Sequence, residues 1–127
     1  MNGVPGVAGT EPWPTSLAYN PATKTLHVTF DNNETFALAA EYLRVESPSA
    51  EVQGHNPSEK KIVPGRSKVG IMNLEPVGNY AVRIIFDDLH DTGIYSWRYL
   101  HELGRDYQSR WDTYVLELGK RGLKRDP

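Results

Sequence analysis

Hydrophobic and polar residues alternate through the first third of the chain. Leu26, Val28 and Phe30 fall on one side of an extended segment, and Phe36 and Leu38 repeat the pattern shortly afterwards. A period of two residues is typical of strands with one buried face. This region therefore predicts an antiparallel meander. Its predicted strands are residues 16–19, 25–30 and 34–38, with turns at 20–24 and 31–33.

The rest of the chain predicts a second hairpin and three helices. Gly78 and Asn79 separate two apolar segments, and such a pair favours the tight turn of a β-hairpin. Ser96 is a good helix N-cap, and apolar residues then recur at helical spacing. The predicted strands are residues 69–76 and 79–86, and the predicted helices are 39–46, 97–103 and 106–120, the last two interrupted by Gly104.

Together these elements predict an α+β fold. We expect one antiparallel sheet of about five strands, built from hairpins and covered by a short helix and a long C-terminal helix. The predicted domain spans residues 15–123. Residues 1–14 are rich in glycine and proline and are expected to be a disordered tail, and residues 124–127 form a basic C-terminal tail.

Composition narrows the classes of function. The chain has 127 residues and no cysteine, which fits one domain and excludes disulfides, thiol nucleophiles and thiolate zinc sites. A net charge of -2 gives no overall field that attracts nucleic acid. No apolar run approaches the roughly 20 residues that span a bilayer, and no secretory signal is apparent. We expect a cytoplasmic monomer without a cofactor, and neither nucleic acid nor a membrane as partner.

Ionisable residues crowd the predicted turn after residue 86. Asp88 and His90 supply a carboxylate and an imidazole, which suit iron or zinc. A metal site would need a second imidazole, from His55 or His101. The alternative is a turn whose aspartates cap the following helix. The candidate metal ligands are His90, Asp88 and His55.

A second candidate is the long connection 49–68, which lacks sustained periodicity. Long connections inside compact domains are commonly functional or mobile. Here His55, Lys60, Lys61 and Arg66 could receive a phosphate or an acidic partner, and the alternative is a solvated loop. The chain has neither a Walker motif nor a Gly-x-Ser-x-Gly elbow, so a hydrolase is not predicted.

Two blocks of sequence resemble a known family. Residues 43–52 read Leu-Arg-Val-Glu-Ser-Pro-Ser-Ala-Glu-Val, with Gly-His at 54–55, and residues 86–97 read Phe-Asp-Asp-Leu-His-Asp-Thr-Gly-Ile-Tyr-Ser-Trp. In order and spacing they resemble the γ-butyrobetaine hydroxylase-like N-terminal domain family, also called domain of unknown function 971. The likeness covers about residues 14–123.

The resemblance carries three implications. In full-length hydroxylases this domain precedes a separate catalytic domain, so hydroxylase activity is not expected here. There it holds zinc with three cysteines and one histidine, at positions that match Ser47, Ser49, Val52 and His90. Serine and valine cannot replace thiolates, so we expect the zinc site to be lost. A similar module on P-loop ATPases with iron–sulfur clusters implies a role in iron or cluster handling.

These observations favour a non-catalytic binding or accessory domain with an unidentified protein partner. The expected surface joins the His90 turn to the loop 52–68, and its residues are His55, Lys60, Lys61, Arg66, His90 and Asp91. The alternative is a metal-handling protein that binds iron or zinc, or an accessory protein of iron–sulfur assembly. An enzyme is not expected.

Overall fold

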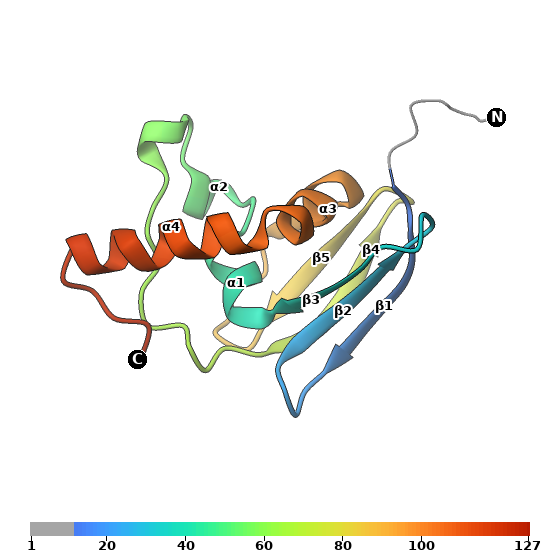
Figure 1. Ribbon diagram of the computed structural model, residues 1–127, viewed down its shortest axis with the longest axis horizontal. Coiled ribbons are helices and arrows are strands. Elements are labelled where there is room, and N and C mark those ends of the chain that lie inside the picture. Colours follow the sequence, from blue (N-terminus) through green and yellow to red (C-terminus); the bar gives the residue numbers. More distant parts are fainter. Residues whose placement is uncertain (1–11) are drawn as a thin grey trace.

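The computed structural model describes residues 12–127 as two three-stranded antiparallel sheets with helices packed against them (Figure 1). The predicted α+β class is confirmed. None of the helices in this part of the chain has the length and apolar character needed to cross a bilayer. In chain order the elements are β1 (Pro14–Asn20), β2 (Thr25–Phe30), β3 (Thr35–Ala39), α1 (Ala40–Val45), α2 (Ala50–Gln53), the 3₁₀ helix η1 (Pro57–Glu59), β4 (Ile71–Val77), β5 (Ala81–Phe86), β6 (Gly93–Ser96), α3 (Trp97–Arg105) and α4 (Tyr107–Lys120).

The first sheet is the predicted meander, with strand order β1-β2-β3. Val28 of β2 pairs with Leu17 on one side and Phe36 on the other, so the apolar residues of the three strands share one face. Both turns contain a non-glycine residue with positive φ, Lys24 at 52° and Asn33 at 69°. Asparagine tolerates this conformation well, which agrees with its place in the turn.

The second sheet has the order β4-β5-β6, so the prediction of one sheet of about five strands was wrong. The sequence reading assigned β6 to the turn, because four residues after a polar turn give too little alternation. Gly93 and Tyr95 are nevertheless buried and Ile94 is exposed, as expected for a strand. β5 is the central strand, and the two sheets remain separate ladders.

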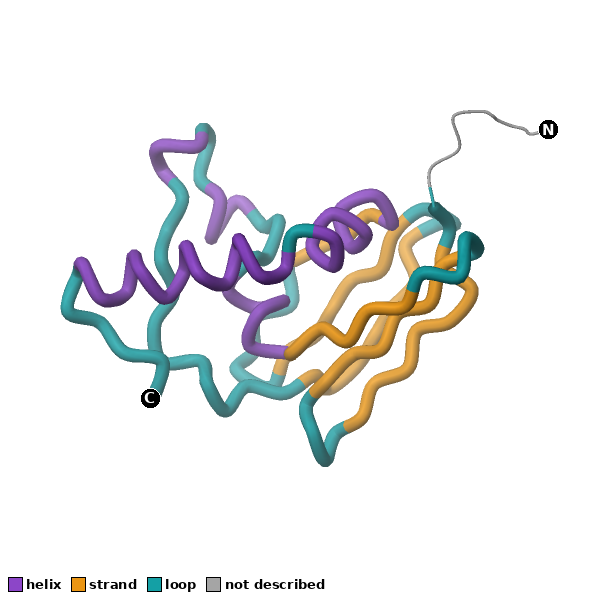
Figure 2. Tube along the Cα trace, in the orientation of Figure 1, coloured by secondary structure: helices purple, strands orange, loops and turns teal. Residues whose placement is uncertain are grey.

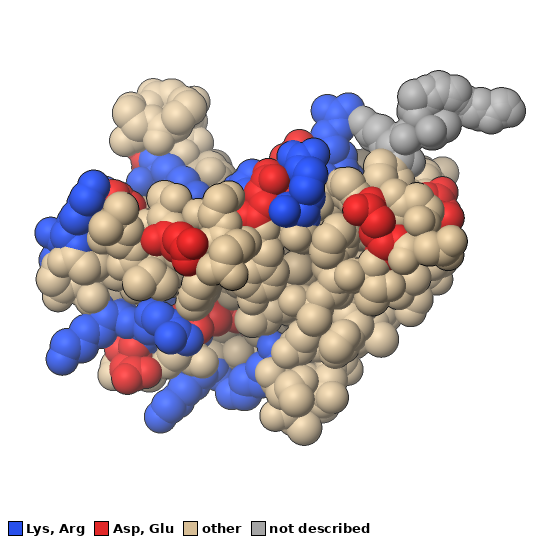
Figure 3. Space-filling model, viewed as in Figure 1, with Lys and Arg blue, Asp and Glu red and all other residues tan. Residues whose placement is uncertain are grey.

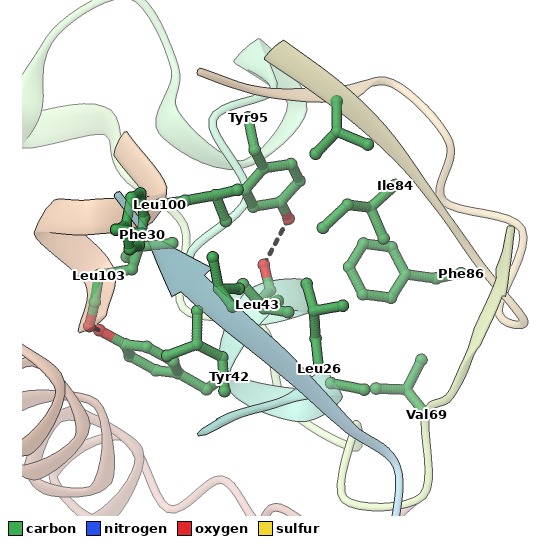
Figure 4. Packing of buried hydrophobic residues seen from close by; sticks show 14 residues of the cluster. Leu26, Phe30, Tyr42, Leu43, Val69, Ile84, Phe86, Tyr95, Leu100 and Leu103 are labelled. Carbon is green, nitrogen blue, oxygen red and sulfur yellow. Dashed lines mark hydrogen bonds between the residues drawn. The ribbon is translucent and has the colours of Figure 1, made fainter. Parts of the chain in front are cut away.

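The main core lies between the two sheets (Figure 4). Leu26 of β2 and Phe86 of β5 belong to the same buried cluster, so apolar packing holds the sheets together where ladder hydrogen bonds do not. Buried hydroxyls in this region are satisfied: Tyr42 donates to the carbonyl of Leu103 at 2.7 Å, and Tyr95 donates to that of Leu43 at 2.5 Å. Each of these bonds fixes a helix to the core.

The two C-terminal helices differ from the prediction in detail. Gly104 does not end the helix, because α3 continues through it to Arg105. A Cβ at position 104 would lie 2.4 Å from Cγ of Phe36, so glycine is needed for close packing of α3 on β3. In α4, Tyr114 and Leu118 pack with Val45 in a second small cluster.

The connection between α1 and β4 contains two short helices that the sequence reading missed. Each has its own cap: Ser49 accepts from the amide of Glu51 before α2, and Asn56 accepts from that of Ser58 before η1. Periodicity is not detectable over three or four residues, which explains the omission. In Figures 1 and 2 the α2–η1 part of the connection projects from the body of the molecule.

The described residues include the end of the predicted N-terminal tail and the whole of the predicted C-terminal tail. Residues 1–11 lie outside the described part of the chain, whereas Pro14 already begins β1. At the other end, the carbonyls of Lys124 and Arg125 accept hydrogen bonds from the amides of Gly65 and Ser67, at 2.9 and 3.0 Å. The basic C-terminal residues are therefore attached to the connection between η1 and β4.

Candidate functional site

The turn between β5 and β6, residues 87–92, is a tightly specified structure. The amide of Phe86 donates to the carbonyl of His90 at 3.0 Å, which closes the turn across Asp88 and Leu89. Asp88 Oδ1 accepts from the amide of His90 at 3.1 Å. Between these two residues Leu89 has a φ of 73°, an unfavourable conformation for leucine, and the residue is 83% exposed.

Asp88 is the electrostatic centre of this turn. Its Oδ2 lies 2.8 Å from Nε of Arg44 in α1 and 2.8 Å from Nε of Arg66 in the long connection. Burial alone would raise the pKa of Asp88, but the His90 amide and the two guanidinium groups outweigh it and hold the pKa below its ordinary value. One carboxylate therefore fixes three segments of the chain.

His90 uses both ring nitrogens within the protein. Nε2 lies 2.8 Å from Ser47 Oγ, and Nδ1 lies 3.3 Å from Glu51 Oε1. Burial lowers the pKa of His90 below its ordinary value, and the positive charge of Arg44 adds to this shift. The neutral imidazole is thus favoured in the folded protein.

A second hydroxyl pair lies beside the first. Ser49 Oγ is 2.8 Å from Thr92 Oγ1, and the amide of Ser49 donates to Ser47 Oγ at 3.2 Å. Gly93 is tightly enclosed there, since a Cβ at that position would lie 2.6 Å from Ser47 Oγ. We call Ser47, Ser49, His90 and Thr92 the polar junction, because they join the start of α2 to the β5–β6 turn.

Ser47, His90 and Glu51 form a row that resembles the nucleophile, base and orienting acid of a hydrolase. A nucleophile must meet the substrate, however, and the exposed fraction of Ser47 is 0%. Its Oγ also accepts from the Ser49 amide. The row therefore lacks an accessible nucleophile, and its geometry suits fixing the turn.

The predicted metal ligands are not assembled into a site. Within residues 12–127, no group of three or more His, Asp or Glu side chains is placed to hold a metal ion. Asp88 is engaged by two arginines and His90 by Ser47 and Glu51. His55 lies apart on the exposed connection, where its amide donates to Glu59 Oε1 at 2.8 Å.

The predicted partner surface is brought together only in part. Arg66 and His90 both contact Asp88, Arg66 through its side chain and His90 through its backbone amide. Asp91 is exposed on the same turn, with Oδ2 3.8 Å from Arg83 Nη1. His55, Lys60 and Lys61 lie farther along the connection around η1, and Lys60 forms an ion pair with Glu46 at 3.0 Å. The connection therefore carries two separate groups of these residues.

The residues that organise the turn lie in the blocks 43–52 and 86–97, apart from Arg66, which lies between them. Residues 17–101 match the family described as γ-butyrobetaine hydroxylase-like, N-terminal. The chain belongs to this family. The recognition made from the sequence blocks is confirmed.

Solved structures of similar chains agree with the γ-butyrobetaine hydroxylase-like N-terminal assignment. Two solution NMR structures are 41% and 40% identical, with TM-scores of 0.80 and 0.81; they match 93% and 94% of this chain over 93% and 89% of their own. A 1.93 Å crystal structure from Acidithiobacillus ferrooxidans, of a protein of unknown function in the DUF971 family, is 33% identical over 75% of this chain and 98% of its own, with a TM-score of 0.64. No curated protein matched.

The positions that the resemblance aligned with zinc ligands do come together in this member of the γ-butyrobetaine hydroxylase-like N-terminal family. Ser47, Ser49 and His90 belong to the polar junction, and Val52 is buried in α2. Two hydroxyls and an isopropyl group do not fit zinc, which takes thiolate, imidazole or carboxylate ligands. Here direct hydrogen bonds join the same segments.

Sequence reasoning missed three residues of the site. Arg44 and Glu51 lie in the first signature block, yet their partners Asp88 and His90 are about forty residues away, at 2.8 and 3.3 Å. The exposure of Leu89 depends on the geometry of the turn, which local pattern does not give. A signal was nevertheless present, since Leu89 is the only apolar residue among positions 87–92.

Proposed function

We propose that this chain is a non-catalytic protein-binding module whose main contact is Leu89. The observation that carries the proposal is the display of this leucine: the residue is 83% exposed on a turn that is fixed on both sides. Leaving a leucine side chain in water and holding its backbone at positive φ both cost free energy. Residues held in such sparsely populated backbone conformations cluster at sites of function.

The rigidity of the turn supports recognition. Asp88 and His90, the two neighbours of Leu89, are held by Arg44, Arg66, Ser47 and Glu51, so the backbone that carries the leucine is fixed on both sides. A pre-ordered contact loses little conformational entropy when a partner binds. A charged rim around an apolar centre is also the usual composition of a protein interface.

The connection that includes α2 and η1 extends this surface. It is fixed to the turn through Glu51 and Arg66, and its α2–η1 part projects from the body of the molecule (Figure 1). His55, between α2 and η1, is exposed. Gln53, His55 and Pro57 line a depression of about 360 Å³ on this connection. We propose that a protein partner contacts Leu89 first and this connection second.

Affinity capture with a matched pair of variants tests the proposal. Leu89→Ser removes the proposed contact, and Leu116→Ser changes a similarly apolar residue that is 58% exposed on α4. Proteins retained from an extract of the source cells are quantified by mass spectrometry for wild type and both variants. We expect at least one partner to be retained by wild type and Leu116→Ser and lost with Leu89→Ser, by about tenfold or more.

Equal retention by Leu89→Ser and wild type would refute the proposal. Amide NMR spectra of both variants establish that the comparison is between folded proteins. A partner that depends on Leu116 and not on Leu89 would move the contact surface to α4, and it would also count against the proposal.

A further inference from the structure

A groove of about 150 Å³ lies between α4 and the segment that follows η1. Val45, Ile62 and Tyr114 form an apolar wall, and Lys60, Lys61 and Arg110 are also part of its lining. The groove is distinct from the turn that carries Leu89. Cavities that combine an apolar wall with a few convergent polar groups are typical of small-molecule sites.

The one buried acid in this groove is already neutralised. Glu46 has a side chain only 5% exposed, and its Oε2 and Oε1 lie 3.0 Å from Lys60 Nζ and 2.9 Å from Arg110 Nη1. Arg110 also has its Nη2 4.0 Å from Glu102 Oε2, so these two cations are matched by two carboxylates. The floor of the groove is therefore close to neutral, and the charge that a ligand meets depends on the rim.

The rim carries a positive charge that is not balanced in this way. Among the described residues, Lys61 has no side-chain hydrogen bond or ion pair, whereas the rim acid Glu117 is engaged by Lys120 and Arg121 at 3.3 and 3.2 Å. Figure 3 shows basic side chains gathered around the C-terminal end of α4. Lys61 is therefore the lining cation whose charge is available to a ligand.

Size and charge together define the ligand. In other proteins a cavity of about 150 Å³ accepts a molecule of the size of benzene. We propose that this groove binds a small carboxylic acid with an apolar body of that size, its carboxylate on Lys61 and its body against Val45 and Ile62. The acid is either a free molecule or the C-terminal residue of a peptide, since both present the same chemistry. This site goes beyond the proposed function and needs no protein partner.

Ligand chemistry is the first test. The ¹⁵N-labelled protein is titrated with phenylacetate, with neutral phenylacetamide and with cationic benzylamine, and amide shifts are followed by NMR. We expect saturable shifts around Ile62 and Tyr114 with phenylacetate and at least ~10-fold weaker binding of the other two, since neither can make the charge-assisted hydrogen bond to Lys61. Equal binding of the three compounds, or no saturable shift, would overturn the proposal.

Two further compounds distinguish a free acid from the C-terminal residue of a peptide as the ligand. N-acetylphenylalanine and its C-terminal amide place the carboxylate on a peptide-like body. Tighter binding of N-acetylphenylalanine than of phenylacetate supports a peptide C-terminus, and the reverse order supports a free acid. Binding of the amide equal to that of N-acetylphenylalanine would contradict the role of the carboxylate.

Two variants test whether the carboxylate of the ligand binds to Lys61. Lys61→Met keeps most of the side-chain stem and should raise the Kd for phenylacetate about tenfold, with little change for phenylacetamide. Lys68→Met is the matched control on an exposed lysine that is not part of the groove, and it should leave the Kd unchanged. An unchanged Kd in Lys61→Met would overturn the assignment. Leu89→Ser should bind phenylacetate like wild type, so failure here is distinguishable from failure of the proposed protein contact.

Discussion

The Arg125 guanidinium holds the Glu41 carboxylate through two hydrogen bonds, from Nε at 2.9 Å and from Nη2 at 2.7 Å. Glu41 lies in α1 with a side chain 7% exposed, whereas Arg125 is near the end of the chain. Its guanidinium carbon also lies 5.1 Å from the centre of the Trp111 ring. The pair therefore attaches the C-terminal segment to the body of the fold.

Removing this arginine should destabilise the protein. In Arg125→Ala the Glu41 carboxylate stays buried without its partner, and we expect a loss of about 1–3 kcal/mol in the free energy of unfolding, because Arg125 itself is partly solvated. Urea denaturation measures this loss. The control is Arg121→Ala, which breaks only an exposed pair with Glu117 and should change stability by less than ~0.5 kcal/mol. Equal effects would contradict the anchoring role.

Asp88 offers a second comparison. Asp88→Asn leaves Arg44 and Arg66 without their shared anion, and we expect a loss of about 2–4 kcal/mol in the free energy of unfolding. Asp91→Asn is the matched change three positions later, on a carboxylate 3.8 Å from Arg83, and should cost less than ~0.5 kcal/mol. Chemical denaturation of both variants checks the difference. A mild effect at position 88 would show that the two ion pairs contribute little.

Two helical glycines should respond in opposite directions to alanine. Gly104→Ala would place a Cβ against the Phe36 ring, and we expect a loss of about 1–3 kcal/mol in stability. At Gly119 no atom lies within 4 Å of an added Cβ, so Gly119→Ala should stabilise the protein by up to ~1 kcal/mol through helix propensity. Thermal unfolding of both variants tests the contrast. Combining Gly104→Ala with Phe36→Leu should recover part of the loss.

Stability should rise with pH as His90 loses its proton. The pKa of His90 is lowered in the folded protein, mainly by burial, so between that pKa and the unfolded value near 6.5 the unfolded chain binds more protons. The free energy of unfolding should therefore fall as pH decreases through about 6.5 toward the folded pKa. His90→Gln should lack this dependence, whereas exposed His27→Gln should keep it. A dependence that survives in His90→Gln would assign it to another group.

Local pattern was sufficient for much of the fold. The alternation of Leu26, Val28 and Phe30 predicted β2 because one face of that strand is buried along its whole length. The four residues of β6 gave too short a pattern, and Gly104 suggested a helix end although it serves close packing against Phe36. Local pattern also could not show that the two hairpins form separate sheets, which depends on how their faces pack.

The candidate site was predictable only where family resemblance supplied distant pairings. Ser47 and His90 are 43 positions apart, and no periodicity connects them, yet the aligned zinc positions placed them together and the structure has them at 2.8 Å. The ion pairs of Asp88 and the exposure of Leu89 depend on tertiary geometry. Composition could not reveal either feature.

The polar junction also determines which environments the fold tolerates. Ser47, Ser49, His90 and Thr92 join their segments through hydroxyl and imidazole contacts, and the chain contains no cysteine. Peroxide and disulfide exchange act on thiolates, so they have no target among these four side chains. The contacts that join α2 to the β5–β6 turn therefore do not depend on the oxidation state of a thiol.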